Sequence, residues 1–293
     1  MISKYLDPKN DYAFKKIFGE EKRKRIPIAF LNAVFHLEGK NRIIDLEFLN
    51  PTQVPAIAAR KESVVDLLVR DQNGAKYIVE MQVAKIEGFE KRAQFYAAKT
   101  YCAHFNVGQA YHELKKVIFL AITSYVVFPD KKDYKSDHVI LDNKTYHHDL
   151  KDFSFSFVEL PKFTKSVEEL ETLEEKWYYF LKHADESNEV DELMKSPEIR
   201  EAYEVVERSS WSEQEFIQYE RAAMAIADAK GALSAAKKEG IEEGIKKGKK
   251  EGIREGEKAT YLKMAKALLV QGMRIEEIQA LTGLSEKEIQ RLD

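Results

Sequence analysis

Two carboxylates lie inside apolar runs on either side of a turn-forming segment. Asp66 is surrounded by valine and leucine, Glu80 by tyrosine, isoleucine, valine and methionine, and the polar segment 71–74 separates the two runs. This pattern over residues 62–83 predicts a β-hairpin. A carboxylate in an apolar run is costly to desolvate unless something compensates its charge. One such group on each arm of the hairpin therefore indicates a bound cation.

The length of the hairpin loop decides whether the carboxylates can meet. A two-residue Asn-Gly loop would set Asp66 opposite Met81, and the carboxylates would face opposite sides of the sheet because side chains alternate. A three-residue loop, 72–74, would set Asp66 opposite Glu80 at about 5 Å between Cβ atoms, which suits a shared Mg²⁺. Glycine at the third position favours the longer loop, although Asn-Gly is also a strong signal for the shorter one. A hairpin with one exposed polar face and no metal is a further alternative.

The surrounding segments predict an α/β fold that holds this hairpin. Apolar spacing and end signals predict helices at 11–18, 26–35 and 89–105, and strands at 42–50, 116–123, 138–141 and 153–160. On the helix that follows the hairpin, Arg92, Tyr96 and Lys99 share one face. That face is a candidate contact for the metal site or for a phosphate, and ordinary helix surface is the alternative.

Asp66, Glu80 and Gln82 together resemble the D…ExQ variant of the PD-(D/E)XK nuclease core. More narrowly, the chain is similar to the Rpn family of recombination-promoting nucleases, also called PD-(D/E)XK nuclease family transposases. Segment 10–19 resembles the family's opening helix, and segment 92–96 resembles the helix after the catalytic strand. The resemblance extends from residue 1 to about residue 185. It implies a restriction-endonuclease-like core, in which helices flank a mixed central sheet.

The resemblance also implies a division of roles. Asp66 and Glu80 would ligate Mg²⁺, for which Mn²⁺ or another divalent ion can substitute, and the carbonyl of Met81 would complete the protein side. The ion would polarise the scissile phosphate and lower the pKa of a water, which Gln82 would orient. Most nucleases of the wider superfamily have lysine at this position, so the metal must supply the positive charge. Asp11 is a weaker candidate for an additional acidic group.

The implied function is that of a metal-dependent DNA endonuclease, acting in DNA recombination or in mobile-element or phage-defence processes. Two alternatives stay open: a nuclease fold that binds DNA with weak catalysis, and an oligomeric regulatory protein in which the carboxylates are surface charges. The sequence contains no RNase H-like arrangement of three acidic residues, so transposition chemistry is not predicted.

The C-terminal extension is predicted to be all helical. Residues 186–230 form a helical connector, 231–258 a charged helix with glycine at every fourth position, and 259–293 a small module that resembles a helix-turn-helix. The glycine row indicates either a flexible charged linker or a helix whose smooth face lets another helix approach, and we favour self-association into a homodimer or larger oligomer. The last module is interpreted equally as a DNA-binding or an assembly element.

The amino-acid composition limits which class of protein this chain can be. The 293 residues are 44% hydrophobic and 33% charged, which is typical of a globular protein, and the formal net charge is −3. This charge does not indicate nucleic-acid binding, but a local basic patch would be enough for it. A single cysteine, Cys102, suits a reducing cytoplasm. The N-terminus has no apolar signal region, and the longest apolar run is too short to span a membrane.

Overall fold

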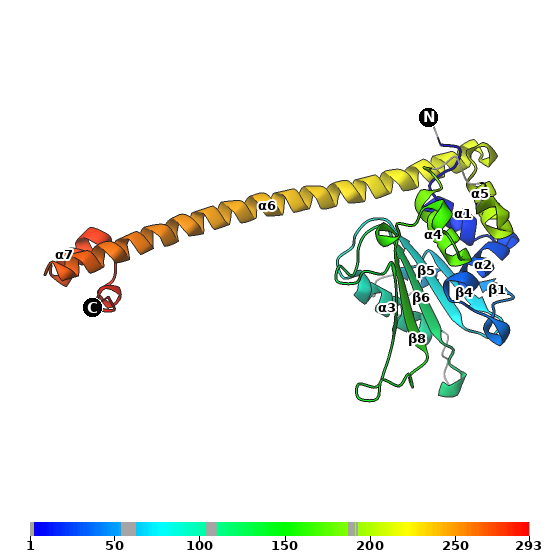
Figure 1. Ribbon diagram of the computed structural model, residues 1–293, viewed down its shortest axis with the longest axis horizontal. Coiled ribbons are helices and arrows are strands. Elements are labelled where there is room, and N and C mark those ends of the chain that lie inside the picture. The colour runs from blue at the N-terminus through cyan, green and yellow to red at the C-terminus, as the bar shows by residue number, and fades with distance from the viewer. Residues whose placement is uncertain (1–2, 54–62, 104–109, 187–190, 192, 293) are drawn as a thin grey trace. The chain divides into compact units, whose positions relative to one another are not determined.

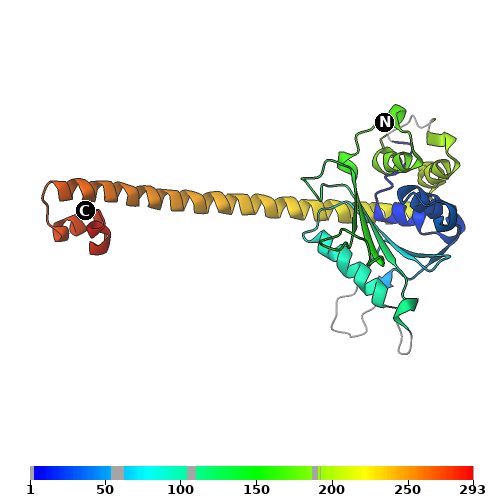
Figure 2. The same ribbon diagram turned by 60° about the horizontal axis from the view of Figure 1, so that its bottom comes forward.

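A computed structural model describes the chain except for residues 1–2, 54–62, 104–109, 187–190, 192 and 293. The chain forms two compact units, Met1–Lys230 and Gly231–Asp293. The first residue of the predicted hairpin, Glu62, and residues 104–105 of a predicted helix lie outside the described residues. Figures 1 and 2 show the first unit as a sheet covered by helices on both faces.

The centre of the first unit is a six-stranded sheet with the order β1-β4-β5-β6-β8-β7. The strands are β1 (Leu46–Phe48), β4 (Leu67–Asp71), β5 (Lys76–Gln82), β6 (Val117–Thr123), β7 (Lys135–Val139) and β8 (Phe153–Glu159). Strands β5, β6 and β8 run parallel, whereas β1, β4 and β7 join antiparallel. A two-stranded sheet pairs β2 (Thr52–Gln53) with β3 (Ser63–Val64). The predicted mixed α/β fold is therefore confirmed.

The β4–β5 hairpin has the three-residue loop. Leu67 pairs with Val79 at the last ladder position, so the next pair in register is Asp66 and Glu80. Gly74 occupies the third loop position with a φ of 86°, a backbone conformation that glycine adopts without a steric penalty. The predicted register is confirmed, and the shorter Asn-Gly loop does not form.

Helices cover the two faces of the sheet unequally. Helices α1 (Asp11–Phe18), α2 (Arg25–Val34), α4 (Leu173–His183) and α5 (Pro197–Val206) share the larger core with one face, and α3 (Phe89–Cys102) packs on the other. Val79 and Met81 of β5 belong to the larger core, whereas Ile78 faces α3. Because side chains alternate along a strand, Glu80 and Gln82 face α3.

Short 3₁₀ helices connect these elements. They are η1 (Glu21–Arg23), η2 (Gly39–Asn41), η3 (Tyr111–Glu113), η4 (Leu160–Lys162), η5 (Val167–Glu169), η6 (Leu193–Lys195) and η7 (Arg208–Ser210). One of them, η5, has a capping box of its own and precedes α4, which begins after a second capping box formed by Thr172 and Glu175.

The predicted first strand, 42–50, is shortened to β1. The Asn32 side chain donates to the Ile43 carbonyl and accepts from the Ile43 N–H, both at 2.8 Å. These two bonds occupy the backbone groups that a strand would use for pairing. The segment before Leu46 is consequently held by α2 rather than by the sheet.

The predicted helical connector, 186–230, contains α5 and the beginning of α6 (Glu213–Val270), with a break between them. The chain near its beginning runs beside the break: the N–H of Leu6 donates to the Val206 carbonyl at 2.9 Å, and the N–H of Arg208 donates to the Lys4 carbonyl at 3.0 Å. The Val206 carbonyl is therefore not available to extend α5. The interruption depends on residues about 200 positions away in the sequence.

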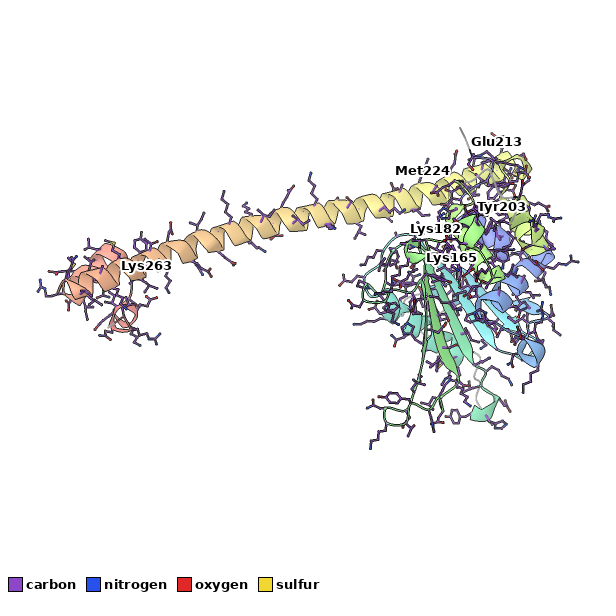
Figure 3. The ribbon with its side chains drawn as sticks, in the orientation of Figure 1. Lys165, Lys182, Tyr203, Glu213, Met224 and Lys263 are labelled. Carbon is purple, nitrogen blue, oxygen red and sulfur yellow. The ribbon has the colours of Figure 1, made fainter. Side chains whose placement is uncertain are left out.

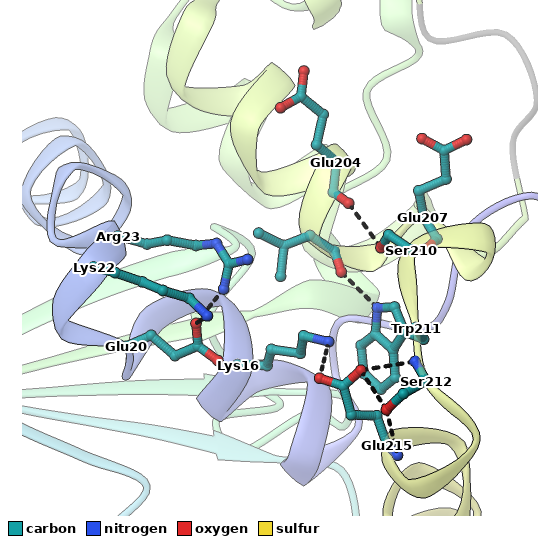
Figure 4. Close-up of polar contacts among 11 residues, drawn as sticks. Lys16, Glu20, Lys22, Arg23, Glu204, Glu207, Ser210, Trp211, Ser212 and Glu215 are labelled. Carbon is teal, nitrogen blue, oxygen red and sulfur yellow. Dashed lines mark hydrogen bonds and ion pairs between the residues drawn. The ribbon is translucent and has the colours of Figure 1, made fainter.

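The first turns of α6 are fixed to α1 (Figure 4). Lys16 lies 2.5 Å from the Glu215 carboxylate and 4.1 Å above the centre of the Trp211 ring. Asn10 caps α1 through its side-chain oxygen, and its amide nitrogen donates to the Tyr219 carbonyl at 3.0 Å. The beginning of α6 thus fixes the N-terminus of α1.

Beyond this base, α6 is exposed. The Met224 side chain, which projects from the helix in Figure 3, is 63% exposed, and residues 231–261 are exposed throughout. A Cβ atom added at Gly240, Gly244, Gly248, Gly252 or Gly256 would have no neighbour within 4 Å. The glycine row is helical, as we favoured over a flexible linker. No helix in the described parts of the chain combines the length and apolarity needed to cross a bilayer.

The second unit ends in a small helical module with its own core. The end of α6 packs with α7 (Ile275–Thr282) and α8 (Glu286–Gln290) around the buried residues Ala265, Ile278, Leu284 and Ile289. Gly272 and Gly283 adopt φ values of 82° and 67° at the two turns, as helix C-termini often require. The first helix of the predicted module, 259–293, is the end of α6 and not a separate element.

Candidate active site

Asp66 and Glu80 meet where β4 begins and β5 ends. Asp66 directly precedes β4, and its carboxylate accepts the Met81 N–H at 2.8 Å. Glu80 is only 2% exposed and faces α3. The hairpin therefore brings together the two carboxylates that were predicted to ligate a metal ion.

Both carboxyl groups have pKa values above their ordinary range, and burial is the largest cause for each. Negative charge is the second cause: the Asp11 carboxylate raises the pKa of Asp66, and Asp66 raises the pKa of Glu80. The charge of Lys15 lowers both pKa values, and that of Arg92 lowers the pKa of Glu80. The site is thus poor in positive charge relative to its buried carboxylates.

Helix α1 contributes a carboxylate and an ammonium group. Lys15 lies 2.9 Å from Asp11, and the Asp11 side chain is close enough to Asp66 to share a hydrogen bond that raises the pKa of Asp66. The sequence indicated Asp11 as a site residue but missed Lys15. The available signal was the spacing of four residues, which puts the two side chains on one helix face.

Helix α3 contributes Arg92 to the site. The other two residues of the predicted face, Tyr96 and Lys99, do not lie at the carboxylates. Arg92 Nη2 lies 3.6 Å from Glu80 Oε2, and its guanidinium is 4.9 Å from the centre of the Tyr96 ring. Tyr96 is buried in the core between α3 and the sheet, and its ring packs against the Arg92 guanidinium. Lys99 lies two turns further, about 10 Å along the axis, toward the helix end that contacts the start of β5.

Several buried polar atoms at this edge of the sheet have no hydrogen-bond partner among the described residues. They are Glu80 Oε1, Gln82 Oε1, Arg92 Nε, Ser124 Oγ and Tyr125 Oη. Gln82 ends β5 and faces the same way as Glu80. Ser124 and Tyr125, which the sequence did not indicate, directly follow β6. Unpartnered buried polar atoms are uncommon, so their concentration here makes this edge of the sheet the candidate binding site.

Comparison with known proteins identifies the family. The profile of the PD-(D/E)XK nuclease family transposase matches residues 8–236, well over half of the chain. The chain belongs to this family. A second profile, of the Rpn/YhgA-like nuclease family C-terminal HTH domain, matches residues 258–293 and confirms the helix-turn-helix interpretation. No curated protein and no solved structure matched the chain.

PD-(D/E)XK nucleases generally use divalent metal ions, and the residues of this site fit such an ion. Glu80 has a buried, unpartnered carboxylate oxygen beside Asp66, and the buried Met81 side chain leaves only its backbone available. Among the described residues, no three His, Cys, Asp or Glu side chains form a metal-binding group. Two carboxylates and a carbonyl suit Mg²⁺, which usually keeps several waters.

Proposed function

We propose that the protein is a metal-dependent DNA endonuclease that hydrolyses phosphodiester bonds, with Mg²⁺ as its ion and Mn²⁺ or another divalent ion able to substitute. The observation that carries the proposal is the buried pair of Asp66 and Glu80, whose raised pKa values reflect uncompensated negative charge. A divalent cation would offset the charge of the pair. Family membership and the helix-turn-helix domain support DNA as the partner.

Asp66, Glu80 and the Met81 carbonyl would hold the ion. When bound, the ion polarises the scissile phosphate and lowers the pKa of a water. Gln82 follows Glu80 on the same strand face, and its unpartnered amide oxygen can accept a hydrogen bond from the attacking water. Glutamine thereby orients the water without adding charge.

Two flanking cations would contribute the charge that glutamine lacks. Lys15 approaches from α1 and favours the ionised forms of both carboxylates. Arg92 approaches from α3 and, with one guanidinium nitrogen unpartnered, can contact a phosphate oxygen. Hydrolysis at such a site would serve DNA recombination or mobile-element and phage-defence processes.

The direct test is incubation of the purified full chain with supercoiled plasmid and Mg²⁺, Mn²⁺ or EDTA. We expect nicked and linear products with either ion and intact plasmid with EDTA. Intact plasmid with every divalent ion, from protein that is folded and binds DNA, would contradict the proposal.

A second candidate function is DNA binding with weak catalysis, or regulation by an oligomer on the same fold. Gln82 favours it, because most nucleases of the superfamily have lysine at this position. The helix-turn-helix domain also offers DNA contacts that are independent of the metal site. Metal-independent DNA binding without cleavage would support the binding role, and the absence of both metal and DNA binding would support the regulatory role.

The raised pKa values predict that the metal-free protein loses stability as pH rises. Between about pH 4, where these carboxyls ionise in the unfolded chain, and their higher folded pKa values, the folded state binds more protons, so stability falls with pH across this window. Glu80→Gln removes one of the two charges and should stabilise the metal-free protein by about 1–3 kcal/mol at about pH 8.

Thermal melts at about pH 5.5 and about pH 8, either in EDTA or in excess Mg²⁺ without EDTA, measure this effect. The ion should raise the melting temperature of wild type more at the higher pH, because it binds the ionised carboxylates. Glu47→Gln, on exposed β1 surface, is the matched control and should keep the wild-type pH dependence. Equal pH dependence in wild type and Glu80→Gln would contradict the prediction.

We also propose that the chain forms a homodimer or larger oligomer through its C-terminal helices. Ile241, Ile245 and Ile253 are exposed beside the glycine row, and the row would let a second helix approach closely. Gly248→Leu should weaken self-association, whereas Gly248→Ala should not, because alanine adds little bulk and favours the helix by up to about 1 kcal/mol.

Sedimentation of the variants at micromolar concentration tests this assembly. A Cβ atom at Gly248 would meet nothing within 4 Å among the described residues, and we expect the variants to fold normally. Lys246→Leu adds the same side chain about 200° around the helix and is the control. A monomeric wild-type protein would contradict the proposal.

A further inference from the structure

Tyr125 follows β6 next to the end of β5, the strand that carries Glu80, although the two residues are distant in the sequence. The N–H of Ser124 donates to the Gln82 carbonyl at 3.0 Å, which joins the end of β6 to the end of β5. Thr123 Oγ1 donates to the Tyr125 carbonyl at 2.7 Å. The Tyr125 ring packs edge-to-face on Phe89, with 6.4 Å between ring centres. The ring is therefore fixed against the first turn of α3.

Arg92 belongs to the same part of α3. It lies one turn after Phe89, the residue on which the Tyr125 ring packs, so Arg92 and Tyr125 lie at adjacent turns of the same helix face. Burial raises the pKa of Tyr125 to about 12, and the positive charge of Arg92 is among the smaller effects that lower it. Tyr125 consequently keeps its proton at physiological pH and is a neutral hydrogen-bond donor.

Both side chains present donors without partners. Arg92 Nε and the Tyr125 hydroxyl are buried, and neither donates a hydrogen bond within the described parts of the chain. The Ile86 N–H lies against the Tyr125 oxygen and lowers its pKa, so the oxygen acts there as an acceptor and the hydroxyl hydrogen stays available. Gly88 provides no side-chain cap for α3, so the partial positive charge of the helix N-terminus adds to the same region. Two buried donors beside a pair of carboxylates suit a ligand that carries anionic oxygens and is bridged to the carboxylates by a cation.

We propose that Tyr125 is a substrate-binding residue whose hydroxyl, together with the Arg92 guanidinium, binds a phosphate group of the DNA strand next to Asp66 and Glu80. This assignment rests on the proposed nuclease function. Phosphate oxygens accept hydrogen bonds from arginine and tyrosine alike, and two donors from different elements would fix the position of the strand. Glu90, exposed in the first turn of α3, is the nearby carboxylate that would oppose an anion.

The test measures the affinity of the full chain for a fluorescein-labelled DNA duplex by anisotropy, with Ca²⁺ in place of Mg²⁺. Tyr125→Phe removes only the hydroxyl and should weaken binding about 10-fold, with an unchanged salt dependence. Arg92→Gln should weaken binding and reduce the slope of log Kd against log salt by about one. Glu90→Gln should strengthen binding about twofold.

Tyr146→Phe is the matched control, because Tyr146 is exposed in the loop between β7 and β8, at the other edge of the sheet. It should bind DNA like wild type, and circular dichroism should show all four variants folded. Wild-type affinity in Tyr125→Phe, beside cleavage by wild type, would overturn the assignment and leave the nuclease function intact. Weakened binding in Tyr125→Phe, with no cleavage by wild type, would support the phosphate contact and overturn the nuclease function.

Discussion

Replacing Asp66 with alanine is expected to reduce DNA cleavage to background, a loss of about 1,000-fold or more. The substitution removes one of the two carboxylates that would hold the ion, so polarisation of the phosphate and activation of the water are lost together. It also removes the acceptor of the Met81 N–H. The β4–β5 pairing is therefore weakened at its end, next to Glu80. Initial rates of plasmid nicking with saturating Mg²⁺ measure the effect.

Glu47→Gln is the matched control for this experiment. It also removes one negative charge from the sheet, but Glu47 is on β1 and pairs with the exposed Arg70. We expect the control to cut DNA at the wild-type rate. Circular dichroism should show both variants folded. A folded Asp66→Ala protein that cuts DNA as fast as wild type would refute the mechanism.

Replacing Gln82 with alanine should lower the cleavage rate about 100-fold without abolishing it. The substitution leaves both carboxylates in place and removes only the amide that would orient the attacking water. Gln82→Lys should keep measurable cleavage, because it introduces the residue that is usual in the wider superfamily. The comparison separates orientation of the water from the supply of positive charge.

Single-turnover rates, measured over a range of Mg²⁺ concentrations, distinguish these roles. Gln82→Ala should have a lower maximal rate and an unchanged Mg²⁺ dependence. Gln94→Ala, which removes an exposed amide on α3, should match wild type. A Gln82→Ala protein with a wild-type rate would eliminate the orienting role, and a large increase in the Mg²⁺ requirement would make Gln82 a metal ligand instead.

The opposition of Asp66 and Glu80 could be predicted because it depends on local signals. The position of Gly74 in the loop selects the loop length, and the alternation of side chains then determines which residues share a face. All of this information lies within one hairpin. The same is true of the helix-turn-helix, where glycines mark both turns.

The remaining site residues depend on packing between distant segments. Lys15 acts on both carboxylates because α1 lies beside the end of the hairpin, and Tyr125 lies near Arg92 because β6 runs parallel to β5. The four-residue spacing puts Lys15 on the same helix face as Asp11, but nothing in the neighbouring sequence indicates that this face meets the hairpin or that Tyr125 meets α3. The division between α5 and α6 has the same origin, since residues 4–6 cause it.

The glycine row has a consequence for how the protein can evolve. It falls between residues 236 and 258, in the interval that neither family profile covers. Among the described residues, the buried cores on either side share no member, and a Cβ atom added at any glycine of the row would have no neighbour within 4 Å. Substitutions in this interval are therefore not constrained by either core. The nuclease-family domain and the helix-turn-helix domain, joined in this way, can each accumulate mutations without disturbing the packing of the other.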